Sequence, residues 1–379
     1  MTNSIYLDNA ASTPVDPAVI ARLTEVLGGA WGNPSAAHPH GVAARRELTT
    51  ARAQLLAALE DGGLGELVWT SGCTEADALA LFGAAATGEG DVVLSTIEHP
   101  AVAENARRLE RAGRVVRWVR PRPDGRLEPR DVAAQAAGAR VLSFIAVQNE
   151  VGAIQPFAEI AAAVKEVAPR CHVHLDAAQA LGKVPLSCRA LSVDSIALAA
   201  HKLHGPPGIG ALWLRRGAAL EPLWSGGGQQ GGLRSGTQNA SGAAAFGLAA
   251  ELAVQRLEEA TARWRAYAAQ VRATLEAAGA PPVWHLAEDV RAPHILALGF
   301  RRVSAEAVRN TLASRGISVS TGSACATSGG HRSALAELGV GDDVAMVRLS
   351  FGHQTTPEEV ERAARGLAAV VRELAGEPG

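Results

Sequence analysis

Short apolar runs alternate with helical patterns from about residue 40 to residue 215, and this alternation limits the possible folds more than any other feature of the chain. The runs carry few polar side chains, which is typical of strands buried on both faces of a sheet. Buried strands joined by helices form βαβ units, so the sequence predicts an α/β fold with a mainly parallel sheet. We expect seven strands, at 66–70, 91–96, 114–119, 141–147, 172–176, 194–198 and 210–214.

The rest of the chain predicts a second, smaller unit. A glycine cluster at 226–239 interrupts the alternation, and an alanine-rich helical stretch follows at about 240–278. Strands near 294–299 and 346–350 then indicate an α+β domain. A chain of 379 residues is also too long for one small core. We therefore predict two domains: a large one over 15–257, and a small one formed by 1–14 and 258–379.

Charge and cysteine usage narrow the classes of function. The net charge of −2 gives no sign of binding to nucleic acid or to an anionic membrane. No apolar run reaches the roughly 18 residues of a spanning helix, and the first residues lack the features of a secretory signal. The four cysteines show no Cys-x-x-Cys spacing, which fits a reducing compartment better than a disulfide framework. We therefore expect a cytoplasmic protein that binds neither nucleic acid nor membranes.

Lysine is scarce, and one lysine stands where a cofactor would need an amine. The basic residues are arginines except for Lys165, Lys183 and Lys202. Lys202 follows a predicted strand and precedes a turn-rich stretch, and a desolvated lysine amine forms a Schiff base with an aldehyde. Asp176 ends an earlier strand and could pair with a pyridinium nitrogen, although a helix N-cap is an equally good interpretation of that segment alone. Together the two residues suggest pyridoxal phosphate.

Other polar residues also follow predicted strands, where active sites of parallel sheets form. Thr74 begins a helical segment whose N-terminal N–H groups could bind an anion, while an ordinary N-cap by Ser71 or Thr74 is the alternative. His99 follows a second strand and could be a general base, a stacking partner or a structural hydrogen-bonder. Asn149 follows a third strand. Thr74, His99 and Asn149 are therefore candidates for one site.

Two cysteine-containing segments lead to opposite expectations. His172 and His174 share one face of a predicted strand and Cys171 takes the other, and no second cluster has zinc-like spacing, so we expect no metal site. Cys325 lies in a stretch rich in Ser, Thr, Gly and Ala, which predicts an exposed loop. An exposed thiol oxidises readily, which disfavours it in the cytosol unless it has a function, and the composition argues against a buried structural cysteine.

Ten segments in order resemble the cysteine desulfurases, which are pyridoxal-phosphate enzymes of the class V aminotransferase group. The resemblance runs nearly end to end. It implies an aminotransferase-like fold (fold type I), a homodimer, and conversion of L-cysteine to L-alanine with the sulfur passed to an acceptor protein, possible destinations being iron–sulfur cluster assembly or thiolation. The segments are 6–13, 33–38, 69–81, 95–102, 147–156, 174–183, 199–212, 226–239, 320–329 and 347–352.

The resemblance also implies roles for single residues. Lys202 would be the Schiff-base lysine, Asp176 the partner of the ring nitrogen, and His99 a residue that stacks on the ring and moves protons. Gln179 would bind the ring oxygen, and Cys325 would be the nucleophile that accepts sulfur as a persulfide. The remaining implied contacts are Cys73, Thr74 and His201 to the phosphate, Thr237 to the phosphate from a second subunit, and Asn149 and Arg348 to the substrate carboxylate. For Arg348 alone, a surface salt bridge is the alternative.

Four departures from the family pattern stand out. Ala199 replaces a phosphate-binding serine, which removes one hydrogen bond worth roughly 1 kcal/mol. Cys73 replaces a common alanine, although its backbone N–H can still bind phosphate. Gln230 and Gly231 stand where Glu-Arg is frequent, at an expected dimer contact. The segment 329–339 lacks a proline-containing pattern, which weakens the expectation of an iron–sulfur scaffold partner.

Two other interpretations remain open. The first is another enzyme of the same fold, namely an aminotransferase, a kynureninase-like lyase or a selenocysteine lyase, which Lys202 does not exclude. Cys325 discriminates among them, because transamination needs no thiol. The second is a catalytically degenerate scaffold for sulfur transfer, which only Ala199 and the altered glycine cluster support.

Overall fold

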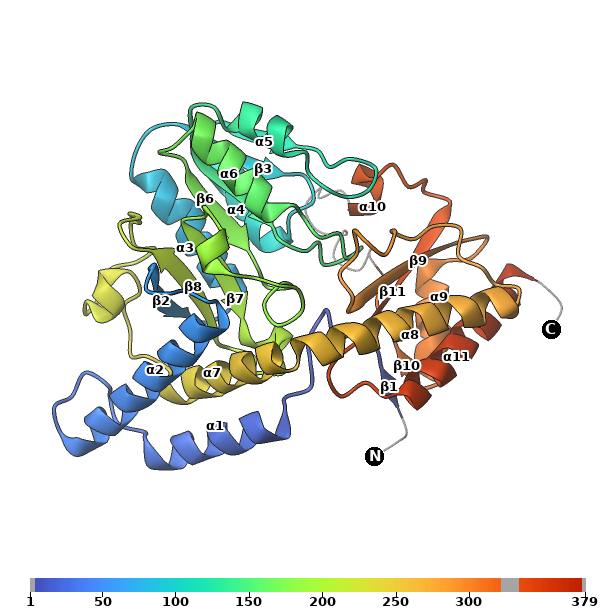
Figure 1. Ribbon diagram of the computed structural model, residues 1–379, viewed down its shortest axis with the longest axis horizontal. Coiled ribbons are helices and arrows are strands. Elements are labelled where there is room, and N and C mark those ends of the chain that lie inside the picture. Colours follow the sequence, from blue (N-terminus) through green and yellow to red (C-terminus); the bar gives the residue numbers. More distant parts are fainter. Residues whose placement is uncertain (1–3, 322–333, 377–379) are drawn as a thin grey trace.

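The computed structural model describes residues 4–321 and 334–376, and a seven-stranded sheet lies at the centre of its larger part (Figure 1). The strand order is β2-β8-β7-β6-β5-β3-β4, and only β8 runs antiparallel to its neighbours. The predicted α/β fold with a mainly parallel seven-stranded sheet is therefore confirmed. The strands are β2 (Gly65–Thr70), β3 (Asp91–Ser95), β4 (Val116–Val119), β5 (Ala139–Ile145), β6 (His172–Asp176), β7 (Ser195–Ala199) and β8 (Gly210–Arg215).

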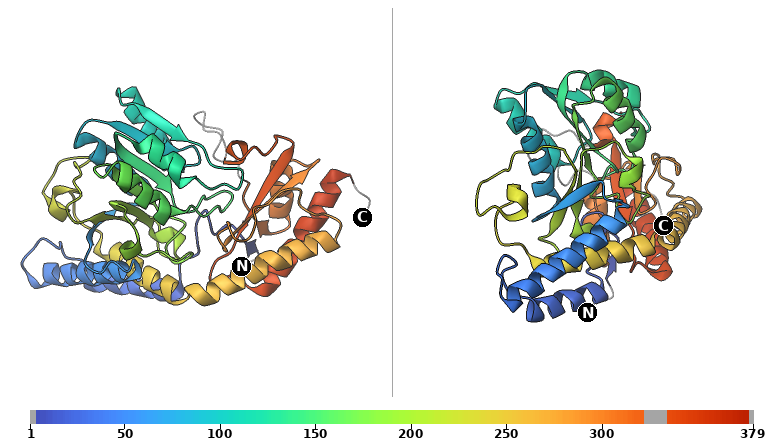
Figure 2. Two further views of the ribbon diagram at one scale, coloured as in Figure 1. Left: turned by 45° about the horizontal axis from the view of Figure 1, so that its top comes forward. Right: turned by 60° about the vertical axis from the view of Figure 1, so that its left-hand side comes forward.

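Helices cover both faces of this sheet. On one face α3 (Cys73–Ala86) and α4 (Pro100–Arg111) pack against β2, β3, β5, β7 and β8 through one apolar cluster. On the other face a larger cluster holds α2, α5, α6 and α7, and α1 lies against α7 (Figure 2). The sheet is thus the middle of three layers. These other helices are α1 (Pro17–Gly29), α2 (Pro39–Ala58), α5 (Pro129–Ala136), α6 (Phe157–Val167) and α7 (Ala240–Gln255).

A second apolar cluster joins the two ends of the chain. It combines residues of β1 with residues from 260 onward. The strand β9 (Ile295–Arg301) pairs antiparallel with β11 (Val344–Ser350), and β1 (Ile5–Tyr6) pairs parallel with β10 (Ile317–Ser318). This cluster supports our division at 14/15 and 257/258, which stays a prediction. Its helices are α8 (Leu257–Ala277), α9 (Ala305–Ser314) and α11 (Pro357–Ala375), while α10 (Ala334–Glu337) packs in a separate small cluster with Ala297 and Met346.

The predicted helical stretch at 240–278 divides into α7 and α8 at Arg256. The Arg256 guanidinium lies 2.8 Å from Asp16, the N-cap of α1, so one residue joins three helices. Figure 1 shows α8 continuing from the large sheet to the smaller one. The break therefore lies where the chain passes from one apolar cluster to the other.

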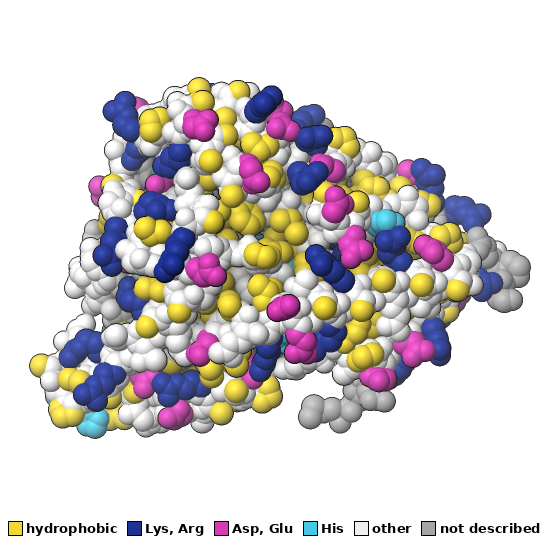
Figure 3. Space-filling model, in the orientation of Figure 1, with side chains coloured by type: hydrophobic (Ala, Val, Ile, Leu, Met, Phe, Trp, Pro, Cys, Tyr) yellow, Lys and Arg dark blue, Asp and Glu magenta, His cyan; other side chains and the backbone are white. Residues whose placement is uncertain are grey.

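The surface carries both signs of charge. On the face drawn in Figure 3, basic and acidic side chains are interspersed over the whole outline. Among the described residues, no helix has the length and apolar character to cross a lipid bilayer. Cys73, Cys171 and Cys188 are free thiols, and the cytoplasmic location stays a prediction.

Candidate active site

Lys202 lies on a short 3₁₀ turn, Ala200–Lys202, directly after β7. Its Nζ donates to the carbonyl oxygens of Ala10 and Ala11 at 2.7 and 2.8 Å. Burial, with the positive charge of Arg348 nearby, lowers the pKa of Lys202 to about 8. A minor but usable fraction of this amine is therefore neutral near neutral pH and can act as a nucleophile or a base.

The N-terminal segment forms one wall of the site beside Lys202. Thr13 donates through both its backbone N–H and its hydroxyl to the carbonyl of His201, at 3.0 and 2.9 Å. His201 Nδ1 lies 3.3 Å from the hydroxyl of Ser12. Burial first, and then the charge of Lys202, lower the pKa of His201 to about 4, so its ring is neutral at neutral pH.

Asp176 is the last residue of β6 and is buried, which is where the sequence predicts a partner for a ring nitrogen. Its Oδ1 accepts the backbone N–H of Ala178 at 3.0 Å and lies 3.6 Å from the sulfur of Cys73. Burial, reinforced by the charge of Asp176, raises the pKa of Cys73 well above its usual range, so the thiol keeps its proton. Asp176 therefore caps a turn and also presents a carboxylate at the strand end.

The N-terminus of α3 is open, because its N-cap is Gly72, which has no side chain to cap it. Neither Ser71 nor Thr74 is the N-cap. The N–H groups of the first helical residues, Cys73 and Thr74, have no acceptor within the helix. A Cβ on Gly210 would lie 2.6 Å from the carbonyl carbon of Gly72, so β8 approaches this turn as only glycine permits. The turn can therefore hold an anion.

The glycine cluster at 226–239 contacts the N-terminus of α3 and the edge strand of the sheet. Arg234 forms an ion pair with Glu75 in the first turn of α3, at 2.8 Å. The amide of Gln230 bonds both the N–H and the carbonyl of Trp69 on the edge strand β2, at 2.6 and 2.9 Å. Gln230 thus covers part of an exposed strand edge. Thr237, further along the same segment, is exposed.

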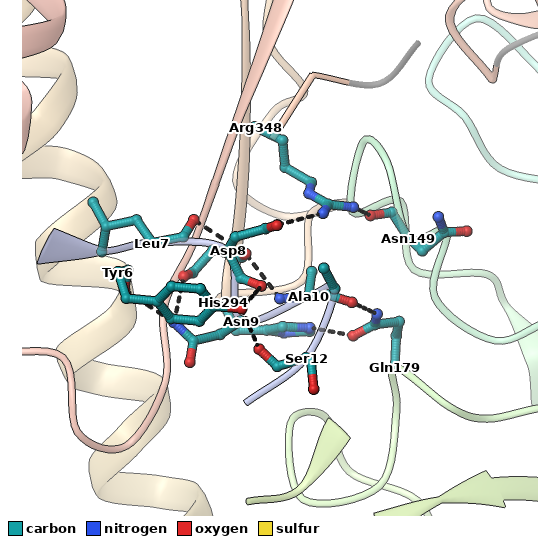
Figure 4. Close-up of polar contacts among 12 residues, drawn as sticks. Tyr6, Leu7, Asp8, Asn9, Ala10, Ser12, Asn149, Gln179, His294 and Arg348 are labelled. Atoms are coloured by element: carbon teal, nitrogen blue, oxygen red, sulfur yellow. Dashed lines mark hydrogen bonds and ion pairs between the residues drawn. The ribbon is translucent and has the colours of Figure 1, made fainter. Parts of the chain in front are cut away.

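Arg348 and Asn149 meet, together with an acidic residue that the sequence analysis did not select. Arg348 is only 6 % exposed, and its guanidinium donates to the carboxylate of Asp8 and to the backbone carbonyl of Asn149, both at 2.7 Å (Figure 4). Its Nε has no hydrogen-bond partner among the described residues. The interpretation of Arg348 as a surface salt bridge is therefore wrong. This guanidinium is buried, and each of its terminal nitrogens has a second hydrogen that a carboxylate could accept.

Gln179, like Lys202, bonds to the carbonyl of Ala10. Its amide N–H donates to the carbonyl of Ala10 at 2.7 Å, and its oxygen accepts from the buried amine of Lys183 at 2.8 Å. His294 Nε2 lies 3.3 Å from that oxygen (Figure 4). An amide nitrogen has two hydrogens, so one remains for a bound group.

His99 is the N-cap of α4, and its Nδ1 accepts the N–H of Ala101 at 3.1 Å. This bond fixes the ring at the start of the helix, so the structural role weighed for His99 is present. Among the causes that lower the pKa of His201, after burial and two lysines, is the charge of His99, which places the two rings near each other. Cys325 lies outside the described residues.

Known proteins resemble the whole chain. A family model described as "Aminotransferase class-V" matches residues 5–363. "Cysteine desulfurase" of Gluconacetobacter diazotrophicus is 36% identical and "Cysteine desulfurase IscS" of Pseudomonas entomophila is 38% identical. Each alignment covers 98% of this chain, and 94% and 93% of those proteins. A solved structure titled "NifS-like protein" aligns with a TM-score of 0.88 at 30% identity, over 98% of this chain and 100% of that one.

Proposed function

The chain belongs to the class-V aminotransferase family and is a cysteine desulfurase, and from this premise we propose that Lys202 is the amine that carries pyridoxal phosphate. One observation carries the proposal. Burial lowers the pKa of Lys202 to about 8. The buried carboxylate of Asp176 lies near this lysine, and its negative charge partly offsets that decrease. The proposal accounts for the burial of both groups.

The chemistry of the donor set fits pyridoxal phosphate. The uncapped N–H groups of Cys73 and Thr74, with the neutral ring of His201, would hold the phosphate. Asp176 would face the ring nitrogen, Gln179 would offer its remaining N–H to the ring oxygen, and His99 would stack on the ring. When bound, the cofactor supplies an aldehyde carbon for the lysine and a ring that withdraws electrons.

The substrate is L-cysteine, and Arg348, which Asp8 and Asn149 hold in place, would orient it. Arg348 would bind the α-carboxylate, because Asp8 and Asn149 hold its two terminal nitrogens in place and leave a second hydrogen on each. Lys202 would remove the α-proton, for which an amine with a pKa near neutrality is suited. His99 would take the proton of the substrate thiol.

Cys325 would accept the sulfur. Its thiolate attacks the substrate sulfur, an S–S bond forms, and the C–S bond breaks. The carbon left behind takes up protons and leaves as alanine, and Cys325 keeps the sulfur as a persulfide. We propose that an acceptor protein then receives it, for iron–sulfur cluster assembly or for thiolation.

We also propose a homodimer, on the strength of an apolar face that the described chain leaves uncovered. Helix α1 buries Val19 and Val26 and exposes Ile20 and Leu27, which lie two turns apart on one face. Trp31, just after the helix, is 68% exposed. Isolated exposed apolar residues are ordinary, but several large ones along one helix and its end are typical of an interface. Thr237, exposed on the glycine cluster, would then reach the partner's phosphate site.

The test of the activity uses L-cysteine and a reductant with the purified holoprotein, and measures sulfide and alanine. We expect equal amounts of both products, and their loss in Cys325→Ala with the visible absorbance of the cofactor retained. Cys188→Ala is the matched control, because Cys188 is fully buried and burial raises its pKa to about 12. Light scattering during gel filtration measures the mass and so tests the dimer.

The other outcomes of this test discriminate the alternatives. Keto-acid formation would identify an aminotransferase, and turnover of selenocysteine without cysteine would identify a selenocysteine lyase. Bound cofactor without any turnover would identify a scaffold. Undiminished desulfuration by His99→Ala would remove the proposed role of His99 alone.

A further inference from the structure

A line of buried polar side chains runs from the cofactor side of β6 away from the site. Asp77 on α3 has its Oδ1 3.1 Å from Nε2 of His174 on β6. The other ring nitrogen of His174 lies 2.8 Å from the hydroxyl of Ser195 on β7, and that hydroxyl lies 2.7 Å from Nε2 of His172. The four side chains therefore form one continuous hydrogen-bonded chain.

The backbone pattern places these hydrogen-bonded side chains on the same face of β6 as Asp176. Side chains alternate along a strand, so His172, His174 and Asp176 share one face of β6, while Val173 and Leu175 enter the apolar cluster on the other. Helix α3 lies against the first face, and His174 pairs in register with Ser195. These hydrogen bonds thus connect α3, which begins at Cys73 and Thr74, to β6, which ends at Asp176.

Asp77 and Asp176 are too close to carry two charges in this setting. The sulfur of Cys73 and the nearest carboxylate oxygens of Asp77 and Asp176 all lie within 4.8 Å of one another, and both carboxyl groups are buried. Two neighbouring buried carboxyl groups do not both ionise, because a charge on one disfavours a charge on the other. A third carboxyl group that faces them, Glu98, has its pKa raised to about 8 by burial.

The hydrogen bonds decide which carboxyl group stays neutral. Asp176 accepts the N–H of Ala178 and the thiol of Cys73, which favours its charged form. Asp77 bonds to His174 at its Oδ1 and also faces the Cys73 thiol, whose one proton Asp176 accepts, and its Oδ2 has no partner among the described residues, which would be costly for a buried charge. Burial and the charge of Asp176 raise the pKa of Asp77 well above its usual range.

One distribution of protons on the two histidines is compatible with a protonated Asp77. Burial lowers the pKa of His174 to about 3 and that of His172 to about 4, so both rings are neutral. A protonated Asp77 then donates to Nε2 of His174, Nδ1–H of His174 donates to Ser195, and the Ser195 hydroxyl donates to Nε2 of His172. Each of the three hydrogen bonds along the line then has one donor and one acceptor.

We propose that Asp77 is a positioning residue for the reaction: it stays protonated, with His174, Ser195 and His172 holding its proton, and so leaves the negative charge of this buried group on Asp176. The inference rests on the proposed cofactor site, since Asp176 needs that charge to keep a proton on the ring nitrogen. None of the four side chains touches the substrate in this account. Their effect is to fix the charge at the strand end.

The test reads the tautomer of His174 directly. Nitrogen-15 spectra of the holoprotein labelled at histidine, with His174 assigned from the His174→Gln variant, are expected to show the proton on Nδ1 and none on Nε2. A proton on Nε2 would mean that His174 donates to Asp77 and does not hold its proton, and would overturn the proposal. This readout does not depend on turnover.

A conservative variant gives the second readout. Asp77→Asn keeps a donor for His174 and carries no charge, so the pH midpoint of the bound cofactor's visible absorbance should not move, whereas Asp77→Leu, which removes the donor, should weaken cofactor retention. If Asp77 is ionised, Asp77→Asn would instead shift that midpoint by about one pH unit or more, and the proposal would be wrong. Absence of any cofactor absorbance in the unaltered protein would contradict the proposed function itself, while the tautomer would still decide the state of Asp77.

Discussion

The two sides of the active site are built in different ways. The cofactor side consists of Asp176, Lys202 and the N-terminus of α3, which lie at the ends of β6, β7 and β2 of one sheet. The substrate side consists of Asp8, Asn149 and Arg348, and the contacts of Arg348 span 340 residues to Asp8 and 199 residues to Asn149. The backbone ladder of the sheet fixes the first side, whereas pairing between the two ends of the chain and the contacts of a single guanidinium fix the second.

This difference separates the expected effects of substitution. A change on the cofactor side removes a group that the chemistry needs, while the sheet remains in place. A change on the substrate side releases a buried charge from its partners, so it should alter binding of the carboxylate more than the chemical step. Four substitutions test this separation.

The largest effect is expected for Lys202→Ala. Loss of the amine removes both the attachment of the cofactor and the base, and a positioned acid or base alone contributes about 10²–10⁴-fold to rate. We expect kcat to fall by at least that factor and the visible absorbance to change with it, measured on the same preparation. Lys165→Arg is the control, because Lys165 pairs with Asp194 at 2.6 Å and arginine can keep that pair. Unchanged absorbance in Lys202→Ala would move the attachment point to another amine.

On the substrate side, Asp8→Asn should raise KM for L-cysteine by about tenfold to a hundredfold and leave the absorbance unchanged. Asp8 holds the guanidinium of Arg348 with a charge-assisted bond, worth about 1.5–3 kcal/mol when buried. Asp343→Asn is the matched control on the small sheet, because Asp343 pairs with Arg301 at 2.8 Å with both side chains more than 60% exposed. A loss confined to kcat would show that Asp8 acts on the chemistry.

The same contrast explains how much the sequence predicts. The strands of the large sheet and the positions of Asp176 and Lys202 follow from local patterns, since each residue stands at the end of its own apolar run. Asp8 lies in a motif that the resemblance includes, yet nothing local connects it to Arg348. That contact exists because β1 pairs with β10, and residues 8 and 350 form a bridge, so it depends on pairing between the two ends of the chain.

The starts of two helices have local sequence signals that the alternation of strands and helices does not show. Helices α1 and α11 begin with a cap and a proline, Asp16-Pro17 and Thr356-Pro357, which are recognisable start signals. The role of Asp77 has no such signal, because an aspartate inside a helix is usually solvated. Only the packing of α3 on β6 shows that this carboxyl group is buried against His174.

A third substitution measures charge burial on the substrate side. Glu150 follows Asn149, its Oε2 accepts the N–H of Ala334 at 3.2 Å, and burial raises its pKa to about 7. The folded protein therefore binds this proton more tightly than the unfolded chain, so stability is full below about pH 4.5 and falls as the pH rises through about 7. Glu150→Gln should remove that loss and be more stable at pH 8 by about 2 kcal/mol.

Urea unfolding at pH 4.5 and pH 8 measures this difference. Glutamine keeps an oxygen for the N–H of Ala334, so the two proteins should be equally stable at the lower pH. Glu89→Gln, at a fully exposed position, should follow the unaltered protein at both pH values. Equal stability of Glu150→Gln and the unaltered protein at pH 8 would show that Glu150 is solvated in solution.

The smallest expected effect is on the cofactor side, where Ala199→Ser restores a hydroxyl that the family usually has. Ser195 points toward His174, so Ala197 and Ala199 share that face of β7, and Ala199 pairs in register with Gly210, which packs against Gly72. A hydroxyl at 199 would therefore lie beside the open N-terminus of α3. One neutral hydrogen bond to the phosphate is worth about 1 kcal/mol, so cofactor affinity should rise about fivefold to tenfold.

Ala197→Ser is the control that makes this small effect decisive. It adds the same hydroxyl to the same face two residues earlier, inside the apolar cluster under α3, where it gains no phosphate. Both variants should be less stable without cofactor, because each buries an unpaired hydroxyl at a cost of about 1–3 kcal/mol. Only Ala199→Ser should recover that loss when pyridoxal phosphate is titrated into the apoprotein and followed by fluorescence. If both variants behave alike, the phosphate does not lie at the N-terminus of α3, and the cofactor side would need a different anion site.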